Sequence, residues 1–376
     1  MRLFPAALAC ATLIACTGAA PGTPPRGETR EGAPFRVTPV ADFDSPWAMT
    51  FLPDRRMLVT EKDGRLLLLG ADGKTRHVLA TVDVMADGQG GLMDVVLHPG
   101  FATNHLVYFS YSATDSDGRK GVVLARGTFE DGPRPKLGAI KQVFRADPFV
   151  EGNGHFSGRI AFSPDGRYLF FTNGERQKFD PAQDPKATLG KVLRLTPDGK
   201  PAGDPGLTAR GFHPAIWSYG HRNLLGIAFD RAGNLWEQEM GPKGGDEVNL
   251  ILPGRNYGYP LVSDGDHYDG RPIPRHSTRP DLEAPKLSWN PVISPGGLIV
   301  YSGDMFPQWK GDLFIGGLSS QSLVRVDLDG TTARKGDQWP MGARIREVEQ
   351  GPDGALWLLE DGGRGSQGRL LKLTPP

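Results

Sequence analysis

The chain has 376 residues, and its 43 Lys and Arg residues are balanced by 43 Asp and Glu residues. This zero net charge gives no support for binding to nucleic acid or to an anionic membrane, which typically requires clustered positive charge. Hydrophobic residues make up 38% of the chain, enough for a large core, and 51 glycines with 33 prolines suit an all-β protein rich in turns.

The N-terminal segment has the pattern of an export signal. An apolar run over residues 3–15 follows a basic start and is too short to be a permanent membrane span. It ends in Leu-Ile-Ala-Cys, which is similar to a bacterial lipobox, where the signal is cut before a cysteine that becomes lipidated. We expect a signal over 1–16 with Cys16 as the lipidated residue, and a flexible tether over 17–34 rich in Gly, Pro and Thr. A plain secretory signal cut near Ala19 is the alternative. Both cysteines, Cys10 and Cys16, lie in this segment, so we expect no disulfide in the mature domain.

The rest of the chain repeats one short pattern: an apolar pair, a turn containing Pro, Asp or Gly, and then an apolar burst. The six copies cover residues 51–60, 98–109, 162–171, 228–236, 306–315 and 351–359. A turn followed by β-branched and aromatic residues predicts a β-hairpin. Repetition at this spacing predicts a propeller with about four strands per blade. We therefore expect one all-β domain over 35–376, a six-bladed β-propeller whose loops converge at one mouth.

Two segments carry candidates for proton transfer and anion binding. His155 lies among glycines just before an expected strand, and a loop histidine of near-neutral pKa is a candidate general base. A plain surface histidine is the alternative. Arg222 and Asn223 offer a cationic fork beside an amide, which suits an anionic, carbonyl-rich ligand. Packing of the arginine against blade aromatics is the alternative.

Two later segments suggest a cation site and an anion site. Residues 239–249 combine Gly, Asp, Glu and Asn, and hard cations such as calcium bind carboxylate and carbonyl oxygens. The spacing is not that of an EF-hand, and ordinary acidic turns have the same composition. Strand alternation places Arg344 and Arg346 on one face, where two cations need an anionic ligand or a nearby acid. The sequence has no nucleophile elbow, phosphate loop or dinucleotide fingerprint.

Taken in order, these segments resemble the glucose/sorbosone dehydrogenase family of soluble quinoprotein sugar dehydrogenases. The most similar branch is the bacterial aldose sugar dehydrogenases. Each shared phrase is short, but their order and spacing are specific. The phrases lie at residues 46–49, 88–92, 154–159, 189–194, 220–223, 241–242 and 256–258. The resemblance implies pyrroloquinoline quinone (PQQ) and calcium as cofactors and an aldose sugar as substrate.

The resemblance also implies a role for individual residues. His155 would take the proton from the anomeric hydroxyl of the sugar, and Arg222 would lie beside the reacting carbonyl of the cofactor. The residues implied to surround PQQ are Gln89, Arg222, Asn223, Arg344, Arg346, Gln183 and Asn290. The carbonyls of Gly241 and Pro242 would bind the calcium that bridges to PQQ, and Glu247 with the Tyr257 carbonyl would bind a second, structural calcium.

The chain departs from the family pattern in three places. Gly154 precedes His155, where the glucose-specific branch has an Asp. Ser319 stands where the family often sets a Lys against the cofactor. The loops that make the glucose-specific branch dimerise are short here, so we expect a monomer.

The resemblance implies oxidation of aldoses at the anomeric carbon to lactones, with electrons passed to an unknown acceptor, a quinone or a cytochrome. We expect an exported, periplasmic protein that meets the membrane through its lipid anchor only and binds no nucleic acid. Two alternatives remain at this point: a lactonase-like calcium-binding propeller and a non-catalytic binding propeller.

Overall fold

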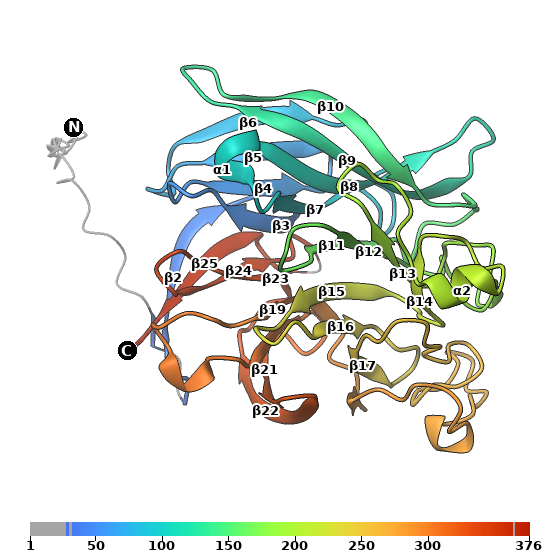
Figure 1. Cartoon of the computed structure of the whole chain (residues 1–376). Helices are drawn as coiled ribbons and strands as arrows, with labels where there is room; N and C mark the ends of the chain where they lie inside the picture. The colour runs from blue at the N-terminus through green and yellow to red at the C-terminus, as the bar shows by residue number, and fades with distance from the viewer. Residues whose placement is uncertain (1–27, 30–31, 364) are drawn as a thin grey trace, which may run out of the picture.

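The computed structural model describes residues 28–29, 32–363 and 365–376, which form a ring of β-sheets (Figure 1). The signal predicted over 1–16, including Cys16, lies outside the described residues. Within the described part of the chain, six sheets surround a central axis, which confirms the predicted six-bladed β-propeller. No helix among these residues is long and apolar enough to cross a membrane.

Each blade consists of antiparallel strands that follow one another in the chain, from the axis outward. The strands of the first three blades are β3 (Pro46–Phe51), β4 (Met57–Glu61), β5 (Arg65–Leu69), β6 (Arg76–Thr81), β7 (Leu92–Leu97), β8 (Leu106–Thr114), β9 (Lys120–Glu130), β10 (Lys136–Arg145), β11 (Ser157–Phe162), β12 (Leu169–Asn173), β13 (Lys191–Leu195) and β14 (Ile216–Tyr219). Those of the next two are β15 (Leu224–Phe229), β16 (Leu235–Glu239), β17 (Asp246–Leu250), β18 (Leu287–Trp289), β19 (Pro295–Val300), β20 (Leu313–Gly317), β21 (Ser322–Asp329) and β22 (Thr332–Pro340).

The last blade joins the two ends of the propeller. It contains β23 (Ile345–Gln350), β24 (Leu356–Glu360), β25 (Arg369–Thr374), β2 (Arg36–Asp42) and β1 (Glu28–Thr29). Strand β2 pairs antiparallel with β25, so that Val37 lies opposite Leu373. Strand β1 pairs with β2, so residues 28–29 of the expected tether extend the edge of this sheet. The ring is therefore closed by hydrogen bonds between the N-terminal and C-terminal strands.

The blades bury both faces of their middle strands, because each blade packs between two others. Accordingly, β4, β16 and β24 are fully buried along their length, whereas the outer strand β22 is mostly exposed. Among the described residues, helix is confined to short turns, which are α1 (Phe101–Asn104), α2 (Pro205–Ala209), η1 (Asp180–Ala182), η2 (His276–Thr278) and η3 (Pro307–Trp309). This distribution matches the continuous apolar runs that follow each turn in the sequence.

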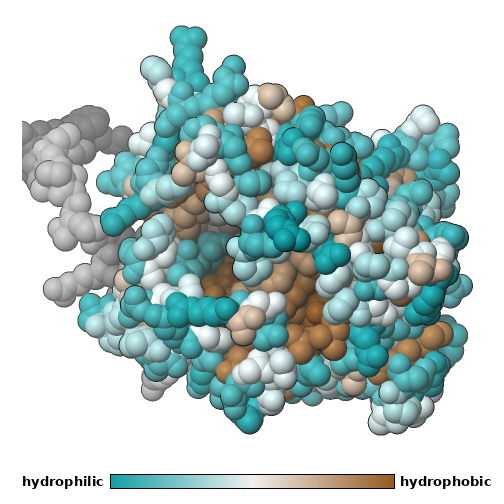
Figure 2. Space-filling model, viewed as in Figure 1, coloured by the Kyte–Doolittle hydropathy of each residue, from teal (hydrophilic) through white to brown (hydrophobic). Residues whose placement is uncertain are grey.

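The innermost strands decide where a site can form. Strands β3, β7, β11, β15, β19 and β23 pack against one another around the axis. The face seen in the space-filling view is hollowed at its centre, with hydrophobic surface beside the hollow (Figure 2). One cavity is lined by the first residues of these strands, such as Pro46 and Ser157, and another by their last residues, such as Phe229 and Val300. The two cavities therefore occupy opposite ends of the central channel.

Candidate functional site

A cavity of about 350 Å³ lies where the inner strands begin, and we call it the central cavity. Its walls combine flat or apolar side chains, such as Trp47 and Phe156, with polar groups. The polar groups include four residues predicted from the sequence, namely Gln89, Asn223, Arg344 and Arg346. They come from three different blades, so the propeller brings together residues that are more than 250 positions apart in the chain. The cavity can hold a flat, polar molecule.

The two arginines on the wall share one carboxylate. Asp361 Oδ2 accepts hydrogen bonds from Arg344 Nε at 2.9 Å and from Arg346 Nη2 at 3.3 Å. Burial alone would raise the pKa of Asp361, but the charge of Arg346 and the hydrogen bond from Arg344 outweigh burial and lower that pKa. Two guanidinium groups thus face one carboxylate. This part of the wall has a surplus positive charge that suits an anionic ligand.

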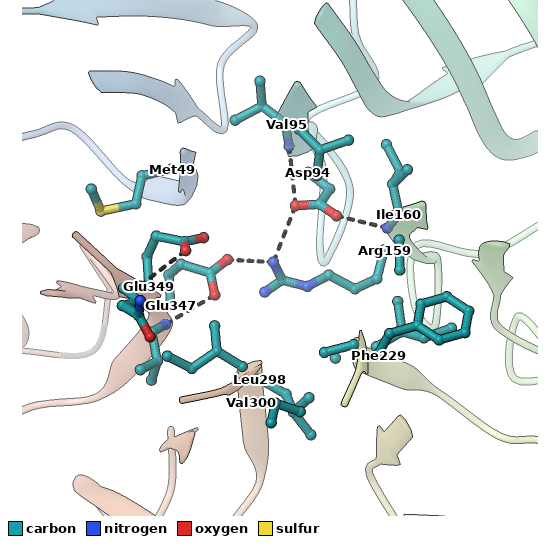
Figure 3. Close-up of a pocket in the computed structure, with 18 of the residues that line it drawn as sticks. Met49, Asp94, Val95, Arg159, Ile160, Phe229, Leu298, Val300, Glu347 and Glu349 are labelled. Atoms are coloured by element: carbon teal, nitrogen blue, oxygen red, sulfur yellow. Dashed lines mark hydrogen bonds and ion pairs between the residues drawn. The ribbon is translucent and has the colours of Figure 1, made fainter. Parts of the chain in front are cut away.

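The opposite end of the channel holds a second cavity of about 380 Å³, with Arg159 at its centre (Figure 3). Its guanidinium lies 3.2 Å from Asp94 Oδ1, contacts the carboxylate of Glu347, and sits 4.1 Å above the ring of Trp47. Because Trp47 lines the central cavity, Arg159 and Trp47 lie between the two cavities. A buried ion-pair layer therefore supports the floor of the central cavity.

His155 is held by two contacts, one at its backbone and one at its ring. Its backbone N–H donates to Gln89 Oε1 at 2.7 Å, and its ring Nδ1 forms a very short contact with Glu175 Oε1. The other oxygen of Glu175 accepts from the backbone N–H groups of Lys178 and Phe179 at 2.6 and 2.7 Å. Glu175 is thus fixed, and it holds the proton of the neutral imidazole on Nδ1. The lone pair of Nε2 is left available to take a proton.

The environment of this pair sets its protonation. Burial lowers the pKa of His155, and the nearby charge of Arg222 lowers it further, while the hydrogen bond to Glu175 opposes both effects. Burial alone would raise the pKa of Glu175, but its hydrogen bond to His155 outweighs burial, and the pKa is lowered. A neutral histidine beside an ionised carboxylate is the arrangement expected of a general base.

Arg222 lies beside the histidine and has one unused donor. Its Nη1 donates to the carbonyls of Met240 and Gly241 at 2.9 and 2.7 Å, and its backbone carbonyl accepts from the N–H of Glu175. The Nε atom is buried and, in the described part of the chain, has no hydrogen-bond partner. Because an unpartnered buried donor is costly, this atom is a ready contact for a ligand.

A third cavity of about 270 Å³ has both His155 and Arg222 on its wall. Phe179 stacks on Tyr259 at its edge, with ring centroids 6.2 Å apart, and Tyr268 is largely exposed there. The polar and aromatic walls suit a small polyol. This substrate-sized cavity adjoins the central cavity, because Phe156 and Asn223, which line the latter, directly follow His155 and Arg222 in the chain.

The predicted cation ligands surround a much smaller space. A cavity of about 10 Å³ has Gly241, Pro242, Glu247 and Tyr257 on its walls. Burial and the charge of Glu239 raise the pKa of Glu247 to about 8. A cation would relieve this cost, so the buried donor set of carboxylate and carbonyl oxygens fits a calcium ion.

Some neighbours of this space were not predicted. His276 Nε2 lies 3.1 Å from the carbonyl oxygen of Tyr257, and the pKa of His276 is raised to about 9 because hydrogen bonding to Asp264 and the charge of Glu247 outweigh burial. A buried cluster of His221, Glu237 and Glu239 lies nearby, with both glutamates on β16 and His221 in the connection between β14 and β15. The region is therefore rich in carboxyl oxygens, which are the ligands that a hard cation prefers.

Comparison with known proteins settles the family. The model of the family described as Glucose / Sorbosone dehydrogenase matches residues 43–372. The chain belongs to this family. The match covers nearly all of the propeller, confirms the resemblance found in the sequence, and places the chain among oxidoreductases.

Several relatives in the glucose/sorbosone dehydrogenase family match this chain over most of its length. Aldose sugar dehydrogenase YliI of Escherichia coli (strain K12) is 38% identical over 341 residues, which cover 89% of this chain and 91% of that protein. The structure of the soluble aldose sugar dehydrogenase from Escherichia coli in the apo-form is 37% identical with a TM-score of 0.83, covering 91% of this chain and 100% of that one. The PQQ-bound form of aldose sugar dehydrogenase from Streptomyces coelicolor is 29% identical with a TM-score of 0.74, and the match covers 90% of this chain and 98% of that one.

Two of the residues that the family resemblance pointed to lie away from the cavities described above. Gln183 Nε2 donates to Asn256 Oδ1 at 3.0 Å and to the Tyr259 carbonyl at 2.7 Å, so its amide braces the loop that carries these two residues. Asn290 lies against Gly244, and it is not on the wall of the central cavity. The structure therefore brings together the other predicted residues but not these two.

The sequence did not reveal Glu175, Asp361 or Lys62, which all belong to the site. Lys62 and Asp361 line the central cavity, and Glu175 holds His155. For Glu175 the sequence did contain an indirect signal. Gly154 stands where the glucose-specific branch has an Asp, so an acid from elsewhere in the chain was needed beside His155. The structure supplies that carboxylate from the loop that follows β12.

Proposed function

We propose that this protein is a PQQ- and calcium-dependent dehydrogenase that oxidises aldoses at the anomeric carbon to lactones. The observation that carries the proposal is the buried His155–Glu175 pair on the wall of a polar cavity that adjoins a cationic one. A base next to an anion-binding cavity is what removal of a hydroxyl proton during sugar oxidation requires. The match to relatives named aldose sugar dehydrogenase supports the substrate class.

The central cavity fits PQQ, an ortho-quinone with three carboxylates. Arg344 and Arg346 would hold carboxylates through charge-assisted hydrogen bonds, and Gln89 and Asn223 would bond to its polar edge. Trp47 would cover part of its flat face. When bound, PQQ supplies an electrophilic carbonyl carbon that accepts the hydride of the sugar.

Calcium fits the small cavity beside Arg222. The carbonyls of Gly241 and Pro242 would hold the ion next to the cofactor, and Glu247 with the Tyr257 carbonyl would hold a second, structural ion. An ion at the first position supplies Lewis-acid polarisation of an oxygen on the cofactor.

The chain's own residues carry the proton transfer. His155 Nε2 would take the proton of the anomeric hydroxyl while hydride leaves the anomeric carbon that carries this hydroxyl. Glu175 keeps the imidazole in the required tautomer and stabilises the positive charge that it gains. The guanidinium of Arg222, with its free Nε donor, would stabilise negative charge that develops on the acceptor side.

The reaction removes two electrons from the sugar, so a second acceptor must receive them. We propose a quinone or a cytochrome for this role. We further propose an exported, periplasmic monomer with a signal over 1–16, a lipid anchor on Cys16 and a propeller domain over 35–376. The lipobox-like pattern and the apolar run before it support the export and the anchor.

The test is reconstitution of the purified protein with PQQ and calcium, followed by aldose-dependent reduction of a dye. We expect activity that needs both cofactors and is lost in His155→Ala. His77→Ala, at an exposed position that lines none of the cavities described above, is the matched control and should keep full activity. Tight PQQ binding without dye reduction by any aldose would favour a non-catalytic propeller. Hydrolysis of lactones without PQQ would favour a lactonase-like enzyme.

A further inference from the structure

Lys62 places a positive charge on the wall of the central cavity. No sequence motif had indicated a role for this residue. It follows β4 directly, in the turn to β5, and is half-buried. Its Nζ donates to the carbonyl of Gly88 at 2.6 Å, beside Gln89, and all three residues line the cavity. An ammonium group has three donors, so two remain for a ligand.

The position of Lys62 is fixed by its backbone and its stem. Its N–H donates to the Ser45 carbonyl at 3.0 Å, and its carbonyl accepts from the N–H of Leu92 at 3.2 Å, which joins the first two blades. The side-chain stem lies against Gly91, where a Cβ would come within 2.5 Å of Lys62 Cγ. Glycine at 91 therefore leaves room for the lysine stem to reach the cavity wall.

The other charged groups on the cavity wall carry only a small net positive charge, so the Lys62 ammonium adds substantially to it. Arg344 and Arg346 both bond to Asp361, so one of their two charges is already balanced. Ser319 also lines the cavity and brings no charge. Burial and the positive charge of Arg346 lower the pKa of Lys62, and an anion in the cavity would offset both effects.

We propose that Lys62 binds a carboxylate of PQQ and supplies the positive charge that Ser319 does not provide. The contact comes from the first blade, on the Gln89 side of the cavity, whereas a lysine at position 319 would act from the fifth blade, after β20. This assignment rests on the function proposed above for the central cavity. It adds a cofactor-binding residue to that function.

The test measures PQQ affinity of the full-length apo-protein by quenching of tryptophan fluorescence, to which Trp47 in the cavity contributes. Lys62→Gln should weaken PQQ binding about 10- to 100-fold, the usual range for losing one charge-assisted hydrogen bond. Lys62→Arg keeps the charge and should stay within a few-fold of wild type. The exposed Lys141→Gln is the matched control and should bind as wild type does.

Relocation of the charge sharpens the test. Ser319→Lys added to Lys62→Gln should restore most of the lost affinity, because both positions line the same cavity. Thermal melting of each apo-variant checks that it folds. Equal PQQ affinity in folded Lys62→Gln and wild type would overturn the assignment while leaving the proposed function intact. Failure of wild type to bind PQQ would instead overturn the proposed function, and this assignment with it.

Discussion

Replacing Glu175 by Gln isolates the part of catalysis that depends on orienting and charging His155. Gln keeps the size of the side chain and one oxygen that can accept from Lys178 and Phe179, but it removes the negative charge beside His155 Nδ1. A hydrogen bond to a charged partner contributes about 1.5–3 kcal/mol. Both side chains are buried, with exposures of 6% for His155 and 0% for Glu175, so water screens this pair little.

That energy translates into two observable effects. Loss of about 1.5–3 kcal/mol from the transition state lowers kcat about 10- to 100-fold. The same loss lowers the pKa of the histidine, because the carboxylate stabilises the imidazolium form. The base must be neutral to take a proton, so the acidic limb of the pH–rate profile should move to lower pH. PQQ affinity should stay unchanged, because Glu175 does not line the central cavity.

The assay is steady-state dye reduction by an aldose from pH 4.5 to 9 in the reconstituted enzyme. The exposed Glu151→Gln is the matched control, and it should leave kcat and the acidic limb as they are. A Glu175→Gln enzyme with wild-type kcat and an unmoved acidic limb would refute the assigned role of this carboxylate.

Four further predictions follow from the structure and the sequence. Replacing Arg344 and Arg346 together by Gln should weaken PQQ binding at least about 100-fold in a fluorescence titration, and an unchanged affinity would remove them from the cofactor site. Chelation of calcium should lower the melting temperature by several degrees and calcium should restore it; a constant midpoint in a protein found free of calcium would contradict the ion sites. Burial raises the pKa of Glu349 to about 8, so between about pH 5 and 8 the folded state keeps a proton on Glu349 that the unfolded state has lost. The folded protein should therefore lose stability as pH rises through this range. Glu349→Gln, which cannot ionise, should reduce that loss by about 1–2 °C in thermal melts. Cys16→Ser should release the protein from membranes, and detergent partitioning like that of wild type would rule out the lipid anchor.

The fold could be predicted from the sequence because its signals are local. Each turn and the apolar run after it lie within about a dozen residues, and their repetition fixes the number of blades. The closure of the ring could not be predicted, because it depends on pairing between Val37 and Leu373, whose local sequences carry no mark of each other. The pairing of β1 with β2 is likewise invisible in a segment with the composition of a linker.

The residues of the functional site likewise fall into those that local sequence predicts and those that depend on long-range pairing. His155 and Arg222 lie in distinctive motifs, so sequence reasoning found them. Glu175 was missed because its role depends on strand pairing: Ser157 pairs with Asn173, which brings the residue two positions before β11 and the residue two positions after β12 to the same end of the blade. Lys62 is similar, since only the contact between the first two blades brings it to Gln89.

The most direct test of the account is a single turnover of bound PQQ. Under anaerobic conditions, an aldose is mixed with protein reconstituted with PQQ and calcium, and the absorbance of the oxidised cofactor is followed. We expect rapid reduction in wild type and reduction slowed about 100- to 10,000-fold in His155→Ala, with the cofactor still bound. Equal rates in the two proteins would contradict the assignment of His155 as the base, and no reduction in wild type with PQQ bound would contradict the dehydrogenase itself.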